Sequence, residues 1–143
     1  FAAHKSFSSY VAEVCEISSD ETGVITIEKV TAAVDCGIAV TPDVVRAQIE
    51  SGIGYGIGHA MRAEITLTDG EVDQSNFYDY ETLRIYDLSQ IETHIVPSAE
   101  LPTGVGEPGT PPAAPALANA ILAIGQPLPA DLPMVRSGIR FSG

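Results

Sequence analysis

The amino-acid sequence predicts an α+β fold in which antiparallel β-hairpins pack against two helices. Three observations support this prediction. Apolar and polar residues alternate with a period of two through the first third of the chain, residues 44–61 and 113–124 have helical features, and Asp69–Gly70 is a strong hairpin turn signal. We find no internal repeat and no second domain, so residues 1–143 are expected to form one domain or a fragment of one.

The first hairpin is predicted from two alternating segments. Val11, Glu13 and Cys15 share one face of the first segment, and residues 24–36 alternate in the same way. The polar residues 20–23 between them are typical of a turn. Shorter strands are expected at 64–67, 71–76 and 91–96, whereas residues 77–86 match no pattern.

The first helix is expected to begin at Thr41, as N-cap, followed by Pro42 in the first turn. Isoleucines at four-residue spacing follow, and four glycines interrupt the same helix at Gly52, Gly54, Gly56 and Gly58. Each glycine inside a helix costs ~1 kcal/mol relative to alanine. The glycines therefore indicate a close approach of the backbone to another helix, a strand or a bound cofactor.

Residues 97–112 are rich in proline and glycine, which excludes a helix or a central strand and predicts a loop. The second helix is expected over 113–124, with Gly125 as its C-terminal stop signal. The tail, residues 126–143, contains three further prolines and is expected to wrap the surface.

The composition excludes several classes of protein. The net charge of −12 disfavours binding to nucleic-acid phosphates, and no apolar run approaches the roughly 20 residues that span a bilayer. Cys15 and Cys36 are too few and too isolated for a disulfide scaffold or a metal cluster, so we expect two small core residues and no metal ligands. Phe1 is not an initiator methionine, and we expect the chain to be a fragment of a longer one.

Glu107 is the strongest candidate for a catalytic residue. It lies between glycines and prolines in Gly104-Val105-Gly106-Glu107-Pro108-Gly109, and such a loop holds a side chain firmly and lets a ligand approach the backbone. A carboxylate in a closed pocket is a natural general base, and the following helix start offers N–H groups for an anion. On composition alone, a solvated glutamate in a surface turn remains the alternative.

The segment 104–121 resembles the signature near the C-terminus of the molybdenum-binding large subunit of the xanthine dehydrogenase/aldehyde oxidase family. Residues 34–43 and the run from Arg46 through the glycine-rich helix are also similar to this family, in particular to its isoquinoline 1-oxidoreductase β-subunit-like group. The resemblance covers nearly the whole chain. It implies that the chain is the C-terminal part of a larger molybdenum-cofactor-binding domain.

The resemblance also implies roles for three residues. Glu107 is expected to act as general base in the water-derived hydroxylation of an aldehyde or N-heterocycle, while Gln48 and Gly106 contact the cofactor. That cofactor is molybdenum-molybdopterin, expected in its cytosine dinucleotide form. The implied partners are the remainder of the large subunit and a small [2Fe-2S] subunit that carries the iron–sulfur clusters. The isolated chain is then expected to be inactive.

Two alternatives stay open from the sequence. The chain could be a non-catalytic interaction or assembly domain, or a degenerate paralogue without cofactor. The remaining polar residues give no competing site: His4, His59 and His94 lack metal-ligand spacing, and the acidic residues Asp79, Glu81 and Asp87 are expected to form a solvated face. The substrate, electron acceptor and compartment, cytoplasmic or periplasmic, are left open.

Overall fold

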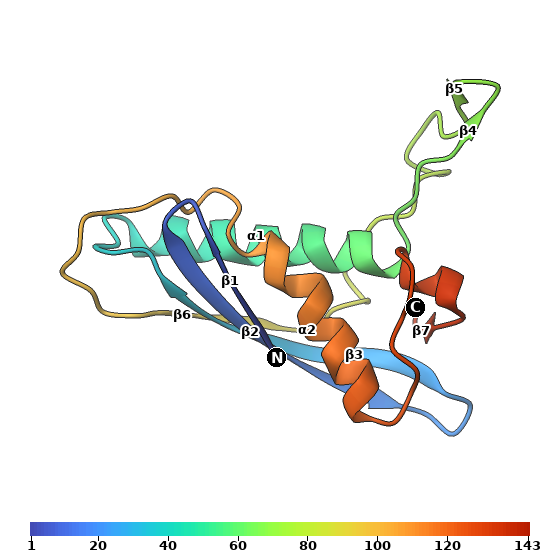
Figure 1. Ribbon diagram of the computed structural model, residues 1–143, viewed down its shortest axis with the longest axis horizontal. Helices are drawn as coiled ribbons and strands as arrows, with labels where there is room; N and C mark the ends of the chain where they lie inside the picture. Colours follow the sequence, from blue (N-terminus) through green and yellow to red (C-terminus); the bar gives the residue numbers. More distant parts are fainter.

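A curled sheet forms the base of the molecule, and both long helices lie on one of its faces (Figure 1). The computed structural model describes residues 1–143. The strands follow the order β1 (Ala2–Ser6), β2 (Ser9–Ser19), β3 (Val24–Asp35) and β6 (Ile91–Ile95), and β7 (Arg140–Phe141) pairs separately with β3. The α+β class and the two packed helices are therefore confirmed.

The hairpin predicted in the first third is present. Strands β2 (Ser9–Ser19) and β3 (Val24–Asp35) pair antiparallel, and a register shift between Glu16 and Ile17 marks a bulge. Val11 lies opposite Val34, and both are buried because directly opposed residues share a face of the sheet. The alternation of apolar and polar residues in β2 and β3 thus decides which face of the sheet is buried beneath the helices.

Two further strands differ from expectation. Strand β1 (Ala2–Ser6), which no pattern predicted, pairs antiparallel with β2. Its sequence contains no β-branched residue, so pairing with the neighbouring strand must decide its conformation. Strand β6 (Ile91–Ile95) forms where expected, but it runs parallel to β3. The sheet is therefore mixed.

Helix α1 (Pro42–Met61) begins after Thr41 as predicted, although the Thr41 side chain makes no capping hydrogen bond. Helix α2 (Thr110–Ala123) begins three residues earlier than the prediction of 113, because Pro111 and Pro112 fit within its first turn. Gly125 adopts a φ of +84° just after the helix, which is the left-handed conformation expected of a C-terminal stop.

Residues 62–90, between α1 and β6, form an extended arm that leaves the body of the molecule and returns to it (Figure 1). It carries β4 (Leu67–Thr68) and β5 (Glu71–Val72), which are shorter than predicted. The Asp69–Gly70 turn joins them as expected. No helix in the structure is long and apolar enough to cross a membrane.

The tail contributes to the core, contrary to the expectation that it wraps the surface. A short 3-10 helix η1 (Met134–Ser137) and strand β7 (Arg140–Phe141) follow α2. Met134 and Ile139 are both buried. The prolines of the tail break regular structure without preventing burial.

One cluster of 21 buried apolar residues fills the space between sheet and helices. Ile49, Ile53 and Ile57 are fully buried along one side of α1, as their four-residue spacing predicts. Cys15 and Cys36 are both buried in this cluster, as expected of small core residues. The core therefore holds α1 and α2 together beneath the loop that carries Glu107.

Candidate active site around Glu107

The loop that carries Glu107 is fixed at both ends. The Thr103 amide donates a hydrogen bond to the Cys36 carbonyl (2.9 Å), next to the end of β3. The Thr110 amide donates to the Glu107 carbonyl (3.0 Å), and the Thr110 hydroxyl donates to the Gly52 carbonyl in α1 (3.1 Å). The backbone at Glu107 is therefore tied to both the sheet and the first helix.

Glu107 itself is exposed in this chain and lines a cleft of about 540 Å³. This volume lies within the ordinary range of small-molecule sites, roughly 300–1,000 Å³. The closed pocket expected from the sequence is not formed by these 143 residues alone. The other residues that line the cleft come from the β1–β2 turn, α1, the loop and the start of α2: Ser6, Phe7, Ser51, Gly52, Tyr55, His59, Gly106, Thr110 and Pro111.

Gln48 lies beside the same loop. Its Nε2 atom donates a hydrogen bond to the Gly106 carbonyl, 3.4 Å away, and links residues that are 58 positions apart in the chain. Its side chain is exposed, so the amide oxygen stays open to a ligand. The fold therefore places Gln48 against Gly106, the residue that precedes Glu107 in the loop.

The glycines of α1 serve packing on two sides of the helix. A Cβ atom on Gly56 would lie 2.6 Å from the Ala113 Cβ, and one on Gly52 would lie 3.2 Å from the Thr110 nitrogen, so this side needs glycine to approach α2. A Cβ on Gly58 would lie 3.0 Å from the Leu83 nitrogen, in the arm. Of the three explanations left open, a neighbouring helix accounts for Gly52 and Gly56.

The start of α2 offers fewer anion-binding groups than expected. Pro111 and Pro112 have no N–H, and the Thr110 amide is occupied by the Glu107 carbonyl. Three of the N–H groups expected at this helix start are therefore not available, those of Thr110, Pro111 and Pro112. Any group bound at the cleft must be recognised by side chains and by the loop backbone.

Comparison with known proteins identifies the family. The model of the molybdopterin cofactor-binding domain matches residues 2–89, which is more than half of the chain. The chain belongs to this molybdopterin cofactor-binding family, within the xanthine dehydrogenase/aldehyde oxidase group.

Relatives of the molybdopterin-binding family extend the match beyond residue 89. The chain is 34% identical over 139 residues to isoquinoline 1-oxidoreductase subunit beta of Brevundimonas diminuta, covering 92% of this chain and 18% of the relative. It is 38% identical over 100 residues to a membrane-bound aldehyde dehydrogenase (pyrroloquinoline-quinone) of Gluconacetobacter polyoxogenes, covering 70% of this chain and 13% of that protein. The chain therefore spans less than a fifth of these relatives.

A solved structure of the same family shares the fold. The CO dehydrogenase from Oligotropha carboxidovorans superposes with a TM-score of 0.69 at 26% identity, over 80% of this chain and 15% of the other. The sequence relatives and this structure are named as oxidoreductases or dehydrogenases, and the chain corresponds to a part of each.

The residues at the cleft fit a molybdopterin group on two structural grounds. No atom lies within 4 Å of the position that a Cβ on Gly106 would take, so the fold of this chain does not itself require glycine there. Gln48 also presents a free amide oxygen beside that open space. No cluster of three or more metal-ligating side chains is present in the chain.

Sequence reasoning missed Ser9, a fully buried residue next to this loop. Its hydroxyl donates to the Gly104 carbonyl (2.7 Å) and lies 2.6 Å from the Thr103 hydroxyl. Because the Ser9 proton goes to Gly104, Thr103 is the donor in the second bond. The available signal was position: Ser9 shares the inward face of β2 with Val11 and Glu13.

Glu13 is a second polar residue on that inward face. It is fully buried, neither carboxylate oxygen has a hydrogen-bond partner, and burial raises its pKa from 4.5 to about 8. A buried charge without a partner is costly, so the carboxyl is neutral at pH 7. Glu13 lies in the core beneath α2 and does not line the Glu107 cleft.

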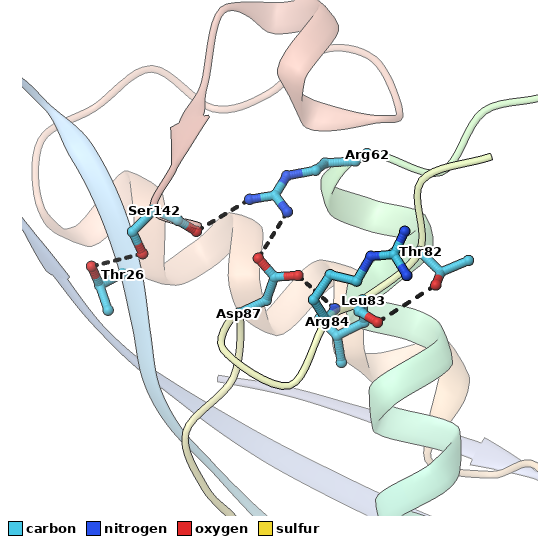
Figure 2. Close-up of polar contacts among 7 residues, drawn as sticks. All are labelled: Thr26, Arg62, Thr82, Leu83, Arg84, Asp87 and Ser142. Carbon is cyan, nitrogen blue, oxygen red and sulfur yellow. Dashed lines mark hydrogen bonds and ion pairs between the residues drawn. The ribbon is translucent and has the colours of Figure 1, made fainter. Parts of the chain in front are cut away.

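Asp87 corrects the expectation of a solvated acidic face. Its side chain is fully buried, and it accepts hydrogen bonds from Arg62 Nη1 (2.8 Å) and from the Arg84 amide (2.6 Å), as Figure 2 shows. Arg62 also donates to the Ser142 carbonyl (3.2 Å). Asp87 thus links the end of α1 to the segment before β6, and Arg62 links the same place to the tail.

The arm residues that matched no pattern form a second cleft. Phe77, Tyr80 and Leu83 line a space of about 510 Å³ along α1, and Tyr55 and His59 belong to both clefts. The two clefts therefore adjoin along the exposed side of α1. This arrangement depends on tertiary contacts that the local sequence does not encode.

Proposed function

We propose that this chain is the C-terminal part of the molybdenum-cofactor-binding domain of a hydroxylase, spanning residues 1–143. The enzyme oxidises an aldehyde or an N-heterocycle with oxygen derived from water, and Glu107 is its general base. Two observations carry the proposal: Gly106 and Glu107 line one cleft, and Gln48 donates a hydrogen bond to the Gly106 carbonyl. The two substrate classes correspond to the names of the relatives, an aldehyde dehydrogenase and an isoquinoline oxidoreductase.

The reaction converts R–H and water to R–OH, with release of two electrons and two protons. When bound, a molybdenum-molybdopterin centre supplies the two-electron oxidation. Glu107 accepts one proton at a carboxylate oxygen from the oxygen nucleophile as the new C–O bond forms. The hydrogen bonds of Thr103 and Thr110 hold this carboxylate in position, because they fix the loop backbone on either side of Glu107.

Gln48 and Gly106 hold the cofactor next to Glu107 in this proposal. The Gln48 Nε2 atom is engaged with the Gly106 carbonyl, which leaves the amide oxygen to accept a hydrogen bond from the pterin. Gly106 leaves space for the group to approach the backbone. Substitution of either residue is therefore expected to weaken cofactor retention before it alters the fold.

The proposed partners complete the site. The remainder of the large subunit would close the cleft over Glu107, and a small [2Fe-2S] subunit would accept the two electrons. The cofactor is proposed to be the cytosine dinucleotide form. The exposure of Glu107 and the short coverage of the relatives support the dependence on further segments, so the isolated chain is expected to be inactive.

Metal and nucleotide analysis of the complete enzyme tests this proposal. We expect near-stoichiometric molybdenum, release of cytidine monophosphate on acid hydrolysis, and iron on a smaller co-purifying subunit. Gln48→Ala should lower the molybdenum content, whereas Glu50→Ala, an exposed substitution on the same helix, should not. A folded complete enzyme without molybdenum would contradict the hydroxylase and favour an assembly domain or a degenerate paralogue.

A further inference from the structure

The turn between β1 and β2 has an unfavourable backbone conformation. Phe7 and Ser8 have φ values of +52° and +65°, and they join the paired residues Ser6 and Ser9 in a two-residue hairpin loop. Hairpins of this kind favour asparagine, aspartate and glycine, which tolerate positive φ. The other such turn in the chain uses Asp69, at +51°, and so follows that preference.

The loop that carries Glu107 holds this strained turn in place. The Gly104 amide donates to the Phe7 carbonyl (3.1 Å), and the Ser9 hydroxyl donates to the Gly104 carbonyl (2.7 Å). A Cβ on Gly104 would lie 2.7 Å from the Phe7 Cβ, so the two backbones are in closest packing. Strain persists where surrounding contacts enforce it, and such sites cluster around function.

Phe7 gains little from burial. The residue is 60% exposed, and it lines the same cleft as Glu107. Folding alone gives no reason for a bulky aromatic residue at this position, because the backbone is strained there and the side chain does not fill the core. Its place in the cleft gives a reason, because an aromatic ring offers a flat apolar wall to a planar ligand.

We propose that Phe7 is a specificity-determining residue that contacts the planar ring of an aromatic substrate beside Glu107. This inference rests on the proposed hydroxylase function. The β1–β2 turn then forms a second wall of the active site, opposite the first turns of α2. Ser8 lies in the same turn but does not line the cleft, so it provides a matched comparison.

Two glycine substitutions separate strain from substrate contact. Phe7→Gly and Ser8→Gly both remove a side chain from a residue with positive φ, so each should raise the urea midpoint of the chain. In the complete enzyme, turnover is measured with isoquinoline and with benzaldehyde, and molybdenum content is measured in parallel. Phe7→Gly should raise KM for both of these aromatic probes by about tenfold at unchanged molybdenum content, whereas Ser8→Gly should leave KM and kcat unchanged.

The inference is overturned if Phe7→Gly leaves KM at the wild-type value, if Ser8→Gly raises it equally, or if Phe7→Gly loses molybdenum. Failure of the underlying function has a different signature. A wild-type enzyme that oxidises neither probe, or a Glu107→Gln variant that retains full turnover, refutes the proposed hydroxylase and this inference together. Wild-type turnover that depends on Glu107 but not on Phe7 refutes this inference alone.

Discussion

The Ser9 hydroxyl donates a hydrogen bond of 2.7 Å to the carbonyl oxygen of Gly104, 95 residues further along the chain. Ser9 begins β2, and Gly104 lies three positions before Glu107. The first hairpin therefore sets the position of the candidate catalytic loop. This contact connects the long hairpin of β2 and β3 with the proline- and glycine-rich loop that carries Glu107.

Ser9→Ala is expected to destabilise the chain by ~1 kcal/mol, because the Gly104 carbonyl and the Thr103 hydroxyl both lose their partner. Urea unfolding of the purified chain measures this change. Ser18→Ala removes an exposed hydrogen bond to Glu28 and serves as the control, with an expected change below about 0.5 kcal/mol. If the two substitutions lowered the free energy of unfolding equally, the buried hydrogen bonds of Ser9 would contribute no more to stability than an exposed one.

Glu13→Gln is expected to change how stability depends on pH. The pKa of Glu13 is about 8 in the folded chain, against an ordinary value of 4.5, so the folded state retains a proton that the unfolded state releases. The contribution of Glu13 to stability is therefore largest below pH 4.5 and falls by up to ~1.4 kcal/mol per pH unit as the pH rises towards 8.

Urea unfolding of Glu13→Gln at several pH values tests this dependence. The glutamine variant should lose the decline between pH 5 and 8, and Glu16→Gln, on the exposed face of the same strand, should keep it. An unchanged slope in the Glu13 variant would mean that its carboxylate is ionised in the folded chain.

Gly56→Ala and Gly54→Ala are expected to have opposite signs. A Cβ at position 56 would lie 2.6 Å from the Ala113 Cβ, so alanine forces α1 and α2 apart at a cost of ~1–3 kcal/mol. A Cβ at position 54 meets only the Leu83 side chain at 3.7 Å, so alanine should stabilise the helix by ~0.5–1 kcal/mol. The thermal or urea unfolding midpoints of the two variants, each compared with the wild type, measure these changes in stability. Destabilisation of both variants to the same extent would contradict the assignment of the two helix faces.

The sequence patterns predict those elements whose formation depends on neighbouring residues in the chain. Alternation in β2 and β3 and the isoleucine spacing in α1 depend only on which side of an element is buried, and both are confirmed. The parallel pairing of β6 and the strand β1 were missed because they depend on neighbours distant in sequence. Asp87 was misread for the same reason, since its partner Arg62 lies 25 residues away.

The candidate site was predictable to a similar degree. The family resemblance predicts Gln48, Gly106 and Glu107 as site residues, and in the fold Gln48 donates a hydrogen bond to the Gly106 carbonyl. Ser9 and Phe7 were not identified, because nothing in their local sequence indicates contact with residue 104. Their proximity follows from the way the first turn packs against the loop.

The rate of the Glu107→Gln enzyme at full molybdenum occupancy tests the central claim most directly. A general base contributes about 10²–10⁴-fold, so we expect kcat to fall by that factor while the fold and metal content stay at wild-type levels. Glu100→Gln, in the same loop region and also exposed, should leave kcat unchanged. Wild-type turnover by Glu107→Gln at equal molybdenum content would contradict the role of Glu107 as the catalytic base.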